Sequence, residues 1–148
     1  MHLTVVGHPS PWSNCVLANY DGELKIGALV YRSRSEPLVP TGCIALNQAQ
    51  RRQCHVNLGD TLEVQEHSKD VGERAESMNL LIRSIEEEQY DGPHTCEVPF
   101  KTLFDGQYFV LNQLVIFQAY ERSFLATVKS YTGGNRLDFS TRLNIKYN

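Results

Sequence analysis

Short apolar runs separated by glycine and proline constrain this sequence more than any other feature. In the first half of the chain such runs cover residues 15–18, 26–31, 42–46 and 61–65. Runs of this length, bounded by turn-forming residues, are typical of β-strands. One short polar helix is predicted between the last two runs, because Asn47 favours the N-cap position and residues 48–53 favour helix. Several strands with a single helix predict a small barrel rather than a helix bundle.

The second half of the chain predicts a separate β-rich unit. A strand is expected over residues 78–85, and Phe100, Leu103 and Phe104 have the spacing of an amphipathic helix over residues 98–105. The remaining expected strands cover residues 109–117 and 123–131, on either side of a turn at residues 119–122, and a weak closing strand near residues 143–147. Overall the sequence predicts a mainly β fold with short helices, of the α+β class.

A charged stretch separates the two halves. Residues 66–77 contain almost no large apolar side chain, which is typical of a solvated linker. We therefore expect one subdomain over residues 1–65, a linker over residues 66–77 and a second subdomain over residues 78–148.

Composition excludes several classes of function. With 41% hydrophobic residues the chain can form a packed core, and its net charge of −3 argues against a nucleic-acid partner. No apolar stretch has the length of a membrane span, and the first residues lack the pattern of a signal peptide, so we predict a cytoplasmic protein without direct membrane insertion. The four cysteines are scattered and are expected to be free thiols, with no metal site.

The usual signatures of catalysis are absent, and no catalytic residue is predicted. There is no phosphate-binding loop, dinucleotide fingerprint, nucleophile elbow or zinc-protease pair. Cys54 and His55 are the residues that most resemble a nucleophile–base pair. Neighbours in a strand point to opposite faces, so their adjacency gives no reason to expect a hydrogen bond between them. Residues 86–88 with Asp91 do not have the alternating spacing of a calcium loop, so we expect a solvated acidic turn. Trp12 is interpreted as a packing residue.

Three stretches carry a resemblance to a known family. Residues 42–52 contain a Gly-x-Ile-Ala strand and a Gln-Arg-Arg helix, and residues 58–64 follow with a turn and an alternating strand. Residues 100–129 contain spaced phenylalanines and glutamines followed by Phe-Leu-Ala-Thr-Val-Lys, and residues 14–19 add a weaker match. Together they resemble the N-terminal domain of N-ethylmaleimide-sensitive factor, a SNARE-disassembly ATPase, within the wider group of N-domains like that of valosin-containing protein.

The resemblance implies a fold and a role. It implies a double-psi β-barrel for the first subdomain and a smaller α/β barrel for the second. It also implies that the chain is the front of a longer protein whose ATPase modules bind ATP and Mg²⁺ and form a hexamer, while this fragment alone is a monomer without cofactors. The expected partners are SNAP adaptors bound to SNARE complexes, which recruit the protein to membranes peripherally in vesicle trafficking, and the protein's own ATPase ring.

The same resemblance selects Arg51, Arg52 and Arg34 as adaptor-binding residues, because SNAP adaptors present acidic surface to a groove between the subdomains in this family. Arginine suits carboxylates because its planar fork can bond both oxygens. Arg32 is a nearby charge. Without the resemblance, the two helix arginines read as ordinary solvated side chains.

Three positions depart from the family pattern. Gln53 stands where the family often has tryptophan, and Thr4 aligns with a basic contact residue. Residues 86–89 replace a second basic cluster with acidic charge, which predicts weaker engagement or an adaptor with an altered surface.

Three alternative roles stay open. The chain could recruit ubiquitin-linked cofactors, as related N-domains do, and the Gln-Arg-Arg helix favours the SNARE branch only modestly. Double-psi barrels also occur in enzymes, which a deep pocket with a perturbed acid, base or thiol would indicate. The third role is a regulatory domain that docks onto its own ATPase ring.

Overall fold

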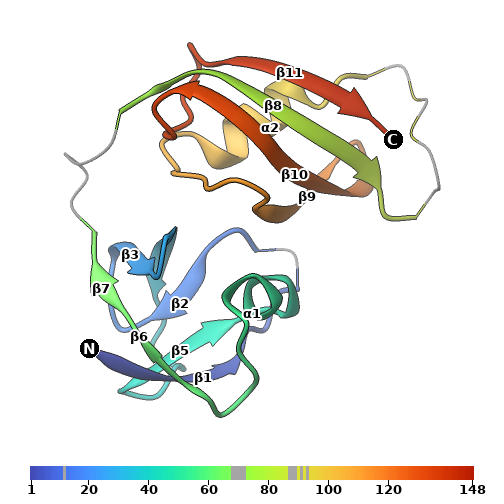
Figure 1. Cartoon of the computed structure of the whole chain (residues 1–148). Helices are drawn as coiled ribbons and strands as arrows, with labels where there is room; N and C mark the ends of the chain where they lie inside the picture. The colour runs from blue at the N-terminus through green and yellow to red at the C-terminus, as the bar shows by residue number, and fades with distance from the viewer. Residues whose placement is uncertain (12, 68–72, 87–89, 91, 93) are drawn as a thin grey trace. The chain divides into compact units, whose positions relative to one another are not determined.

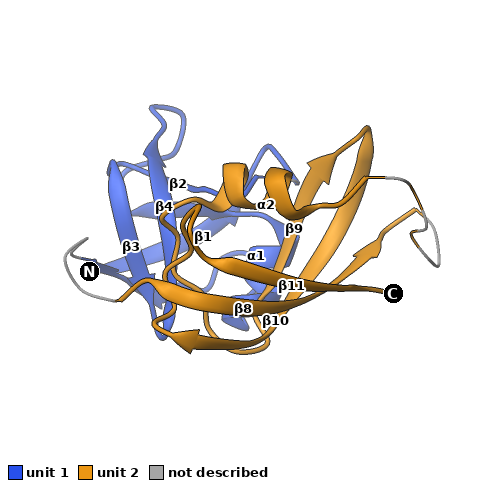
Figure 2. Cartoon of the chain, turned by 90° about the horizontal axis from the view of Figure 1, so that it is seen from above, with its two compact units in different colours: residues 1–71 blue, residues 72–148 orange. Residues whose placement is uncertain are grey.

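The chain is mainly β and forms two compact units (Figure 1). The computed structural model describes residues 1–148 except residues 12, 68–72, 87–89, 91 and 93. Unit 1 comprises Met1–Val71 and unit 2 comprises Gly72–Asn148 (Figure 2). The boundary lies inside the predicted linker 66–77, of which residues 68–72 are outside the described residues, while the last positions of that segment already belong to a strand.

Unit 1 is a seven-stranded sheet with one helix. The sheet has the order β6-β1-β5-β2-β4-β3-β7, in which β1 and β5 are parallel, β2 and β4 are parallel, and the other neighbours are antiparallel. Its elements are β1 (His2–Gly7), β2 (Val16–Ala18), β3 (Gly22–Ile26), β4 (Leu29–Ser35), β5 (Cys43–Leu46), α1 (Gln48–Cys54), β6 (Thr61–Glu63) and β7 (Gln65–Glu66).

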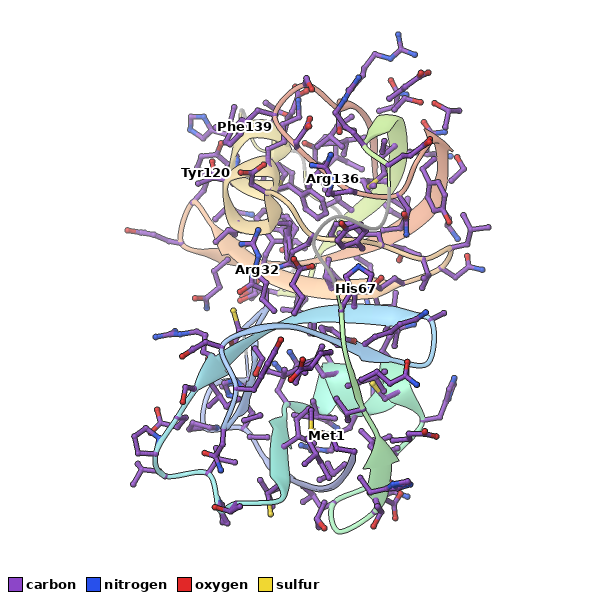
Figure 3. All side chains as sticks on the ribbon, turned by 90° about the vertical axis from the view of Figure 1, so that its left-hand side faces the viewer. Met1, Arg32, His67, Tyr120, Arg136 and Phe139 are labelled. Atoms are coloured by element: carbon purple, nitrogen blue, oxygen red, sulfur yellow. The ribbon has the colours of Figure 1, made fainter. Side chains whose placement is uncertain are left out.

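A single extended segment pairs with both edges of this sheet. Strands β6 and β7 lie at opposite ends of the strand order, yet only Val64 separates them in the sequence. The Val64 N–H donates to the Met1 carbonyl at 2.8 Å, and the Met1 amino group donates to the Val64 carbonyl at 2.9 Å. Figure 3 labels Met1 within unit 1. Beyond β7, the His67 N–H donates to the Glu23 carbonyl at 2.9 Å. The sheet is therefore a nearly closed β-barrel with the Val64 side chain fully buried.

Most of the predicted elements of unit 1 are confirmed, with two errors and one omission. The strands near residues 15–18 and 42–46 and the helix after Asn47 are present, whereas the run 61–65 is divided at Val64 into β6 and β7. The run 26–31 is not one strand, because Gly27 has φ +59° and turns the chain between β3 and β4. Strand β1 was not predicted, although it lies beside β5 and β6 in the barrel.

Unit 2 is a four-stranded sheet of order β11-β8-β10-β9 with α2 across one face (Figure 1). Strand β8 pairs antiparallel with β10 and parallel with β11. The elements are β8 (Ala75–Ser84), α2 (Glu97–Phe104), β9 (Leu114–Ala119), β10 (Arg122–Gly133) and β11 (Arg142–Tyr147).

Five phenylalanines form the centre of the core of unit 2. Phe100 and Phe104 come from α2, Phe109 from the segment between α2 and β9, and Phe117 and Phe124 from β9 and β10. Each ring is no more than 2% exposed, and neighbouring rings pack with centroids between 4.7 and 6.3 Å apart. Such rings contribute through buried area and through tilted and edge contacts. They fix α2 against one face of the sheet.

The predicted elements of unit 2 need two corrections. The helix, the closing strand and the β9–β10 turn are confirmed, and Tyr120 and Glu121 have φ of 53° and 61° in that turn. The run 109–117 is a strand only from Leu114, because the Gln113 side chain accepts a hydrogen bond from the Val110 N–H at 3.0 Å and holds a turn. The strand predicted at 78–85 begins earlier, at Ala75.

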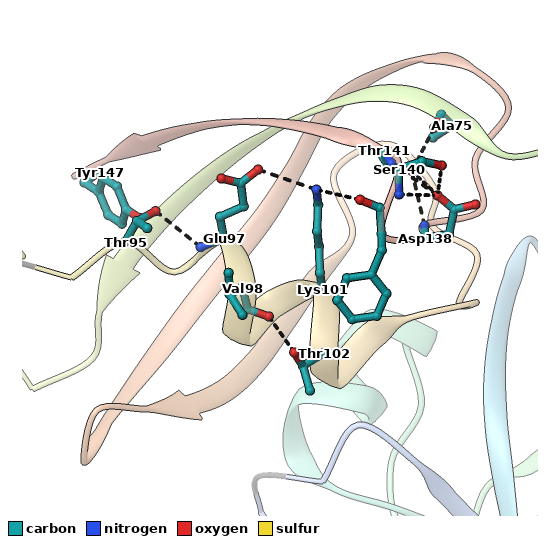
Figure 4. Close-up of polar contacts among 11 residues, drawn as sticks. Ala75, Thr95, Glu97, Val98, Lys101, Thr102, Asp138, Ser140, Thr141 and Tyr147 are labelled. Atoms are coloured by element: carbon teal, nitrogen blue, oxygen red, sulfur yellow. Dashed lines mark hydrogen bonds and ion pairs between the residues drawn. The ribbon is translucent and has the colours of Figure 1, made fainter.

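The loop before β11 is anchored by polar contacts (Figure 4). The Asp138 carboxylate accepts hydrogen bonds from the Ser140 N–H at 2.8 Å and the Thr141 N–H at 3.2 Å, and the Thr141 hydroxyl donates to the Ala75 carbonyl at 2.8 Å. Lys101 of α2 donates to the Phe139 carbonyl at 3.1 Å. Burial opposes ionisation of Asp138, but the bonds from Ser140 outweigh it and lower its pKa. These contacts set where β11 begins.

Truncation of a central core ring tests this account of unit 2. Phe117→Ala removes a 2% exposed ring and should lower the free energy of unfolding by about 3–5 kcal/mol, because a cavity remains in a packed core. Gln118→Ala is the matched control, since Gln118 is the next residue and is exposed on the opposite face; it should change stability by less than about 0.5 kcal/mol. Urea titration followed by circular dichroism measures both, and equal effects would contradict the proposed core.

Candidate functional site

Helix α1, which carries two of the three predicted binding arginines, is fixed at its first turn by a capping box. The Asn47 side chain accepts from the Gln50 N–H at 3.0 Å, and the Gln50 side chain accepts from the Asn47 N–H at 2.9 Å. Both residues are buried. At the other end, His55 has φ 58° and its N–H reaches the carbonyls of the last turn. A seven-residue helix is marginal by itself, so these caps define it.

The same two side chains hold the loop before β2 against α1. The Asn47 amide donates to the Ser13 carbonyl at 2.9 Å, and the Gln50 amide donates to the Cys15 carbonyl at 3.1 Å. Helix and loop are thereby held together although more than thirty residues separate them. Trp12, in the same loop, lies outside the described residues.

The two arginines of α1 have different environments. Arg51 is half-buried and donates to the Leu46 carbonyl, at the end of β5, at 2.6 Å. Arg52 is exposed, and among the described residues it forms no ion pair. No acidic side chain lies on α1 itself. Arg52 is therefore the arginine of the pair whose guanidinium is available to a partner, whereas Arg51 also has a structural bond.

Arg34 lies on β4, whose parallel pairing with β2 places it next to Leu17 and near the loop that α1 holds. The Arg34 charge contributes to the pKa shifts of two nearby groups, His8 and Cys15. Burial lowers the pKa of His8, a bond to the Cys15 backbone opposes this, and Arg34 lowers it further. Burial raises the pKa of the Cys15 thiol, and Arg34 and then Arg32 act against that rise. We use the name α1 site for Arg34, Arg51, Arg52 and the loop residues Ser13 and Cys15.

Sequence reasoning missed Ser13 and Cys15 as members of the α1 site, and His8 as a group influenced by Arg34. Only the Cys15 neighbourhood had a signal, in the weak family match over residues 14–19. The proximity of Cys15 to Arg34 follows from the parallel pairing of β2 with β4, which local sequence patterns do not reveal.

The positions that depart from the family pattern, among them Thr4 and Glu86, lie in different parts of the chain. Thr4 is exposed on β1, opposite Cys43 and Thr61. Glu86 lies just after β8, where its carboxylate accepts from the Ser123 N–H at 3.2 Å and from the Ser84 hydroxyl at 3.4 Å. Hydrogen bonding to its own backbone and to Ser123 lowers its pKa. Residues 87–89 and Asp91 lie outside the described residues.

The Cys54 thiol lacks the features of a nucleophile. Burial raises its pKa to about 11, and its hydrogen-bond partner is the Tyr31 hydroxyl, itself a buried group whose pKa is raised. At neutral pH this thiol is protonated, and the thiolate is the reactive form. His55 is exposed at the helix end. A catalytic Cys54–His55 pair is therefore disfavoured.

Loss of the helix cap should destabilise unit 1. Asn47→Ala removes the cap and the bond to Ser13 and should cost about 1–2 kcal/mol of unfolding free energy. Asn57→Ala, an exposed asparagine in the same unit, should stay within about 0.5 kcal/mol. Urea unfolding with hydrogen exchange of the α1 amides measures both, and unchanged protection in Asn47→Ala would contradict the role of the cap.

Alkylation tests the state of Cys54. With a pKa near 11 instead of 9.0, the folded chain holds about a hundredfold less Cys54 thiolate at pH 8 than the urea-unfolded chain, so iodoacetamide should react correspondingly slowly, as peptide mass spectrometry can measure. Because the folded chain holds this proton more tightly, stability should fall as pH rises from 9 to 11. His55→Asn should leave the rate unchanged; a slower reaction in that variant, or equal rates in folded and unfolded chains, would restore the nucleophile interpretation.

Neither a metal-ligand cluster nor a membrane-spanning helix is present among the described residues. No three His, Cys, Asp or Glu side chains in that part of the chain converge as metal ligands would, and none of its helices has the length and apolar character of a membrane span.

Among known proteins, no family model matches the chain and no curated protein matches its sequence. The α1 site is therefore the basis of the functional proposal.

Proposed function

We propose that this chain is the adaptor-binding N-terminal module of an ATP-driven SNARE-disassembly motor of the N-ethylmaleimide-sensitive factor type. In this proposal the α1 site binds acidic side chains of SNAP adaptors on SNARE complexes. The observation that carries it is the presentation of Arg52, exposed and without an ion pair among the described residues, on a helix held by two buried side chains.

A fixed helix favours such binding for a physical reason. Ordering flexible groups opposes association, so a guanidinium carried by a rigid backbone loses less entropy when it meets a carboxylate. Arginine can bond both carboxylate oxygens, whereas an exposed ion pair of other geometry contributes little. Contacts of this kind give fast, salt-sensitive association, which suits a partner that must be released in each cycle.

The three arginines have graded roles in the proposal. Arg52 makes the principal contact. Arg34 adds positive potential from β4, where it is exposed. Arg51 shares its guanidinium with the Leu46 carbonyl, so it both shapes the turn between β5 and α1 and strengthens the local positive field.

The finer description of the fold belongs to the same proposal. We assign unit 1 as a double-psi β-barrel, which the two parallel pairs β1–β5 and β2–β4 in an otherwise antiparallel sheet support. Unit 2 would be the smaller α/β barrel, supported by the return of β11 parallel to β8. ATP and Mg²⁺ would bind in separate ATPase modules, and the protein would reach membranes through its adaptors.

Charge reversal on α1 tests this function. SNAP–SNARE complex should bind the chain at low salt and more weakly at moderate salt. Arg52→Glu should reduce the affinity by about tenfold or more, because one attractive contact becomes repulsive, and Arg51→Glu/Arg52→Glu should abolish binding. Biolayer interferometry with immobilised complex measures the series.

Lys25→Glu is the matched control, because Lys25 is also exposed in unit 1 and the variant changes the net charge equally. It should alter the affinity by less than about twofold, as a distant screened charge would. If the folded wild-type chain does not bind the complex, the SNAP assignment fails, and binding of ubiquitin-type cofactors becomes the alternative to measure. Equal losses in Arg52→Glu and Lys25→Glu would remove α1 as the contact.

A further inference from the structure

The sheet of unit 2 has a second face, opposite the side that packs against the core. Successive side chains of a strand point to opposite faces, so the buried residues of β8 identify the inner set as Met78, Leu80 and Ile82. The intervening residues Asn79, Leu81 and Arg83 belong to the outer face. We call this surface the outer sheet face, and its remaining members follow from the strand registers.

Charge on this sheet is segregated. Residues 72–148 contain eight Lys and Arg against ten Asp and Glu. Nevertheless, strands β9, β10 and β11 contain no acidic residue, and the only one in β8 is Glu76, at a bulge. The exposed cations of these strands are Arg83, Lys129, Arg142 and Lys146. Within the described residues none of the four forms an ion pair.

Aliphatic side chains lie among these cations. Leu125 of β10 pairs with Ile116 of β9 on one side and with Arg83 of β8 on the other. Leu81 pairs with Lys146 of β11. Leu81, Ile116 and Leu125 are half-buried although they point away from the core. The outer sheet face is therefore an aliphatic strip with a basic border.

An open depression lies on the same surface, beside β11. It has a volume of ≈ 690 Å³, and its lining includes Asn79, Leu81, Lys129, Asn144 and Lys146. The Asn79 amide donates to the Ser130 hydroxyl at 2.6 Å, which fixes its side chain across β8 and β10. The lining thus combines aliphatic and amide side chains with two lysines, whose long side chains can reach a ligand placed over the aliphatic strip.

We propose that the outer sheet face binds an acidic amphipathic helix of a partner protein. Among the described elements of unit 2, α2 packs on the inner face of this mainly antiparallel sheet, and such sheets commonly leave their other face accessible. A helix with aliphatic residues on one side would cover Leu81, Ile116 and Leu125, while flanking carboxylates would meet Lys129 and Lys146. Because the four border cations form no ion pair within the described residues, the border selects acidic over basic helices. This proposal is independent of the α1 site.

The test uses the full chain and a defined probe. The probe is a fluorescein-labelled peptide of about fourteen residues, with leucines at i, i+3, i+4 and i+7 spacing and glutamates between them. Anisotropy should show saturable binding that weakens with salt, and the same peptide with lysines for glutamates should not bind. Lys129→Glu/Lys146→Glu should weaken binding by about tenfold or more, and Leu81→Thr by several-fold, since it removes aliphatic contact without changing charge.

Lys25→Glu is the matched control for Lys146→Glu alone, because the two variants change the net charge equally and Lys25 is exposed in unit 1 outside the α1 site; it should alter the affinity by less than about twofold. Circular dichroism confirms that each variant is folded, and the substituted lysines are exposed. The proposal is overturned if the folded wild-type chain does not bind the acidic peptide, if Lys25→Glu and Lys146→Glu weaken binding equally, or if Leu81→Thr has no effect. Tighter binding of a DNA duplex or an anionic vesicle, lost in Lys129→Glu/Lys146→Glu, would also overturn it, since the face would then be a site for phosphates.

Discussion

The pairing of one extended segment with both edges of the sheet is the interaction on which unit 1 depends. Open sheet edges leave backbone N–H and C=O groups without partners. Strands β6 and β7 satisfy both edges, and Val64 between them exchanges two hydrogen bonds with Met1. Closure places β5 and the start of α1 at a fixed position, so the capping box can reach the Ser13–Cys15 loop. The position of the α1 arginines thus depends on the backbone hydrogen bonds that close the sheet elsewhere in unit 1.

Features set by neighbours in the sequence could be predicted, and features set by distant pairing could not. The helix after Asn47 was predictable because the cap and its Gln50 partner are three residues apart. The error at residues 26–31 arose because Gly27 stands within an apolar run, and only its positive φ reveals the turn. Strand β1 alternates exposed and buried residues and was still missed, and its pairing with β5 and β6 joins segments far apart in the sequence. The same holds for the place of Arg34 beside the Cys15 loop.

The two adjacent arginines illustrate what a resemblance can and cannot supply. By the family match, Arg51 falls on an adaptor-contacting position and Arg52 on a basic neighbour of it. In the structure, Arg51 lies one helical turn beyond Leu46 and bonds its carbonyl at 2.6 Å, whereas Arg52 faces outward. A guanidinium that already has an acceptor must give it up or share it when a ligand arrives, which lowers its net contribution. The structural difference therefore gives the two residues unequal parts in the proposed binding.

Net charge is a weak guide to the partners of a chain whose charges are spatially sorted. The value of −3 is a sum over the whole chain, while the strands of unit 2 beyond β8 carry cations and no carboxylate. Coulombic interactions are screened within about 8–10 Å in physiological salt, so a ligand responds to the surface it touches and not to the sum. Glu86 is an acidic residue that is already engaged within the protein, because its carboxylate accepts hydrogen bonds from the Ser123 backbone N–H. A carboxylate already engaged in this way contributes less to the field of a neighbouring face, so an acidic chain can still present basic surfaces to acidic partners.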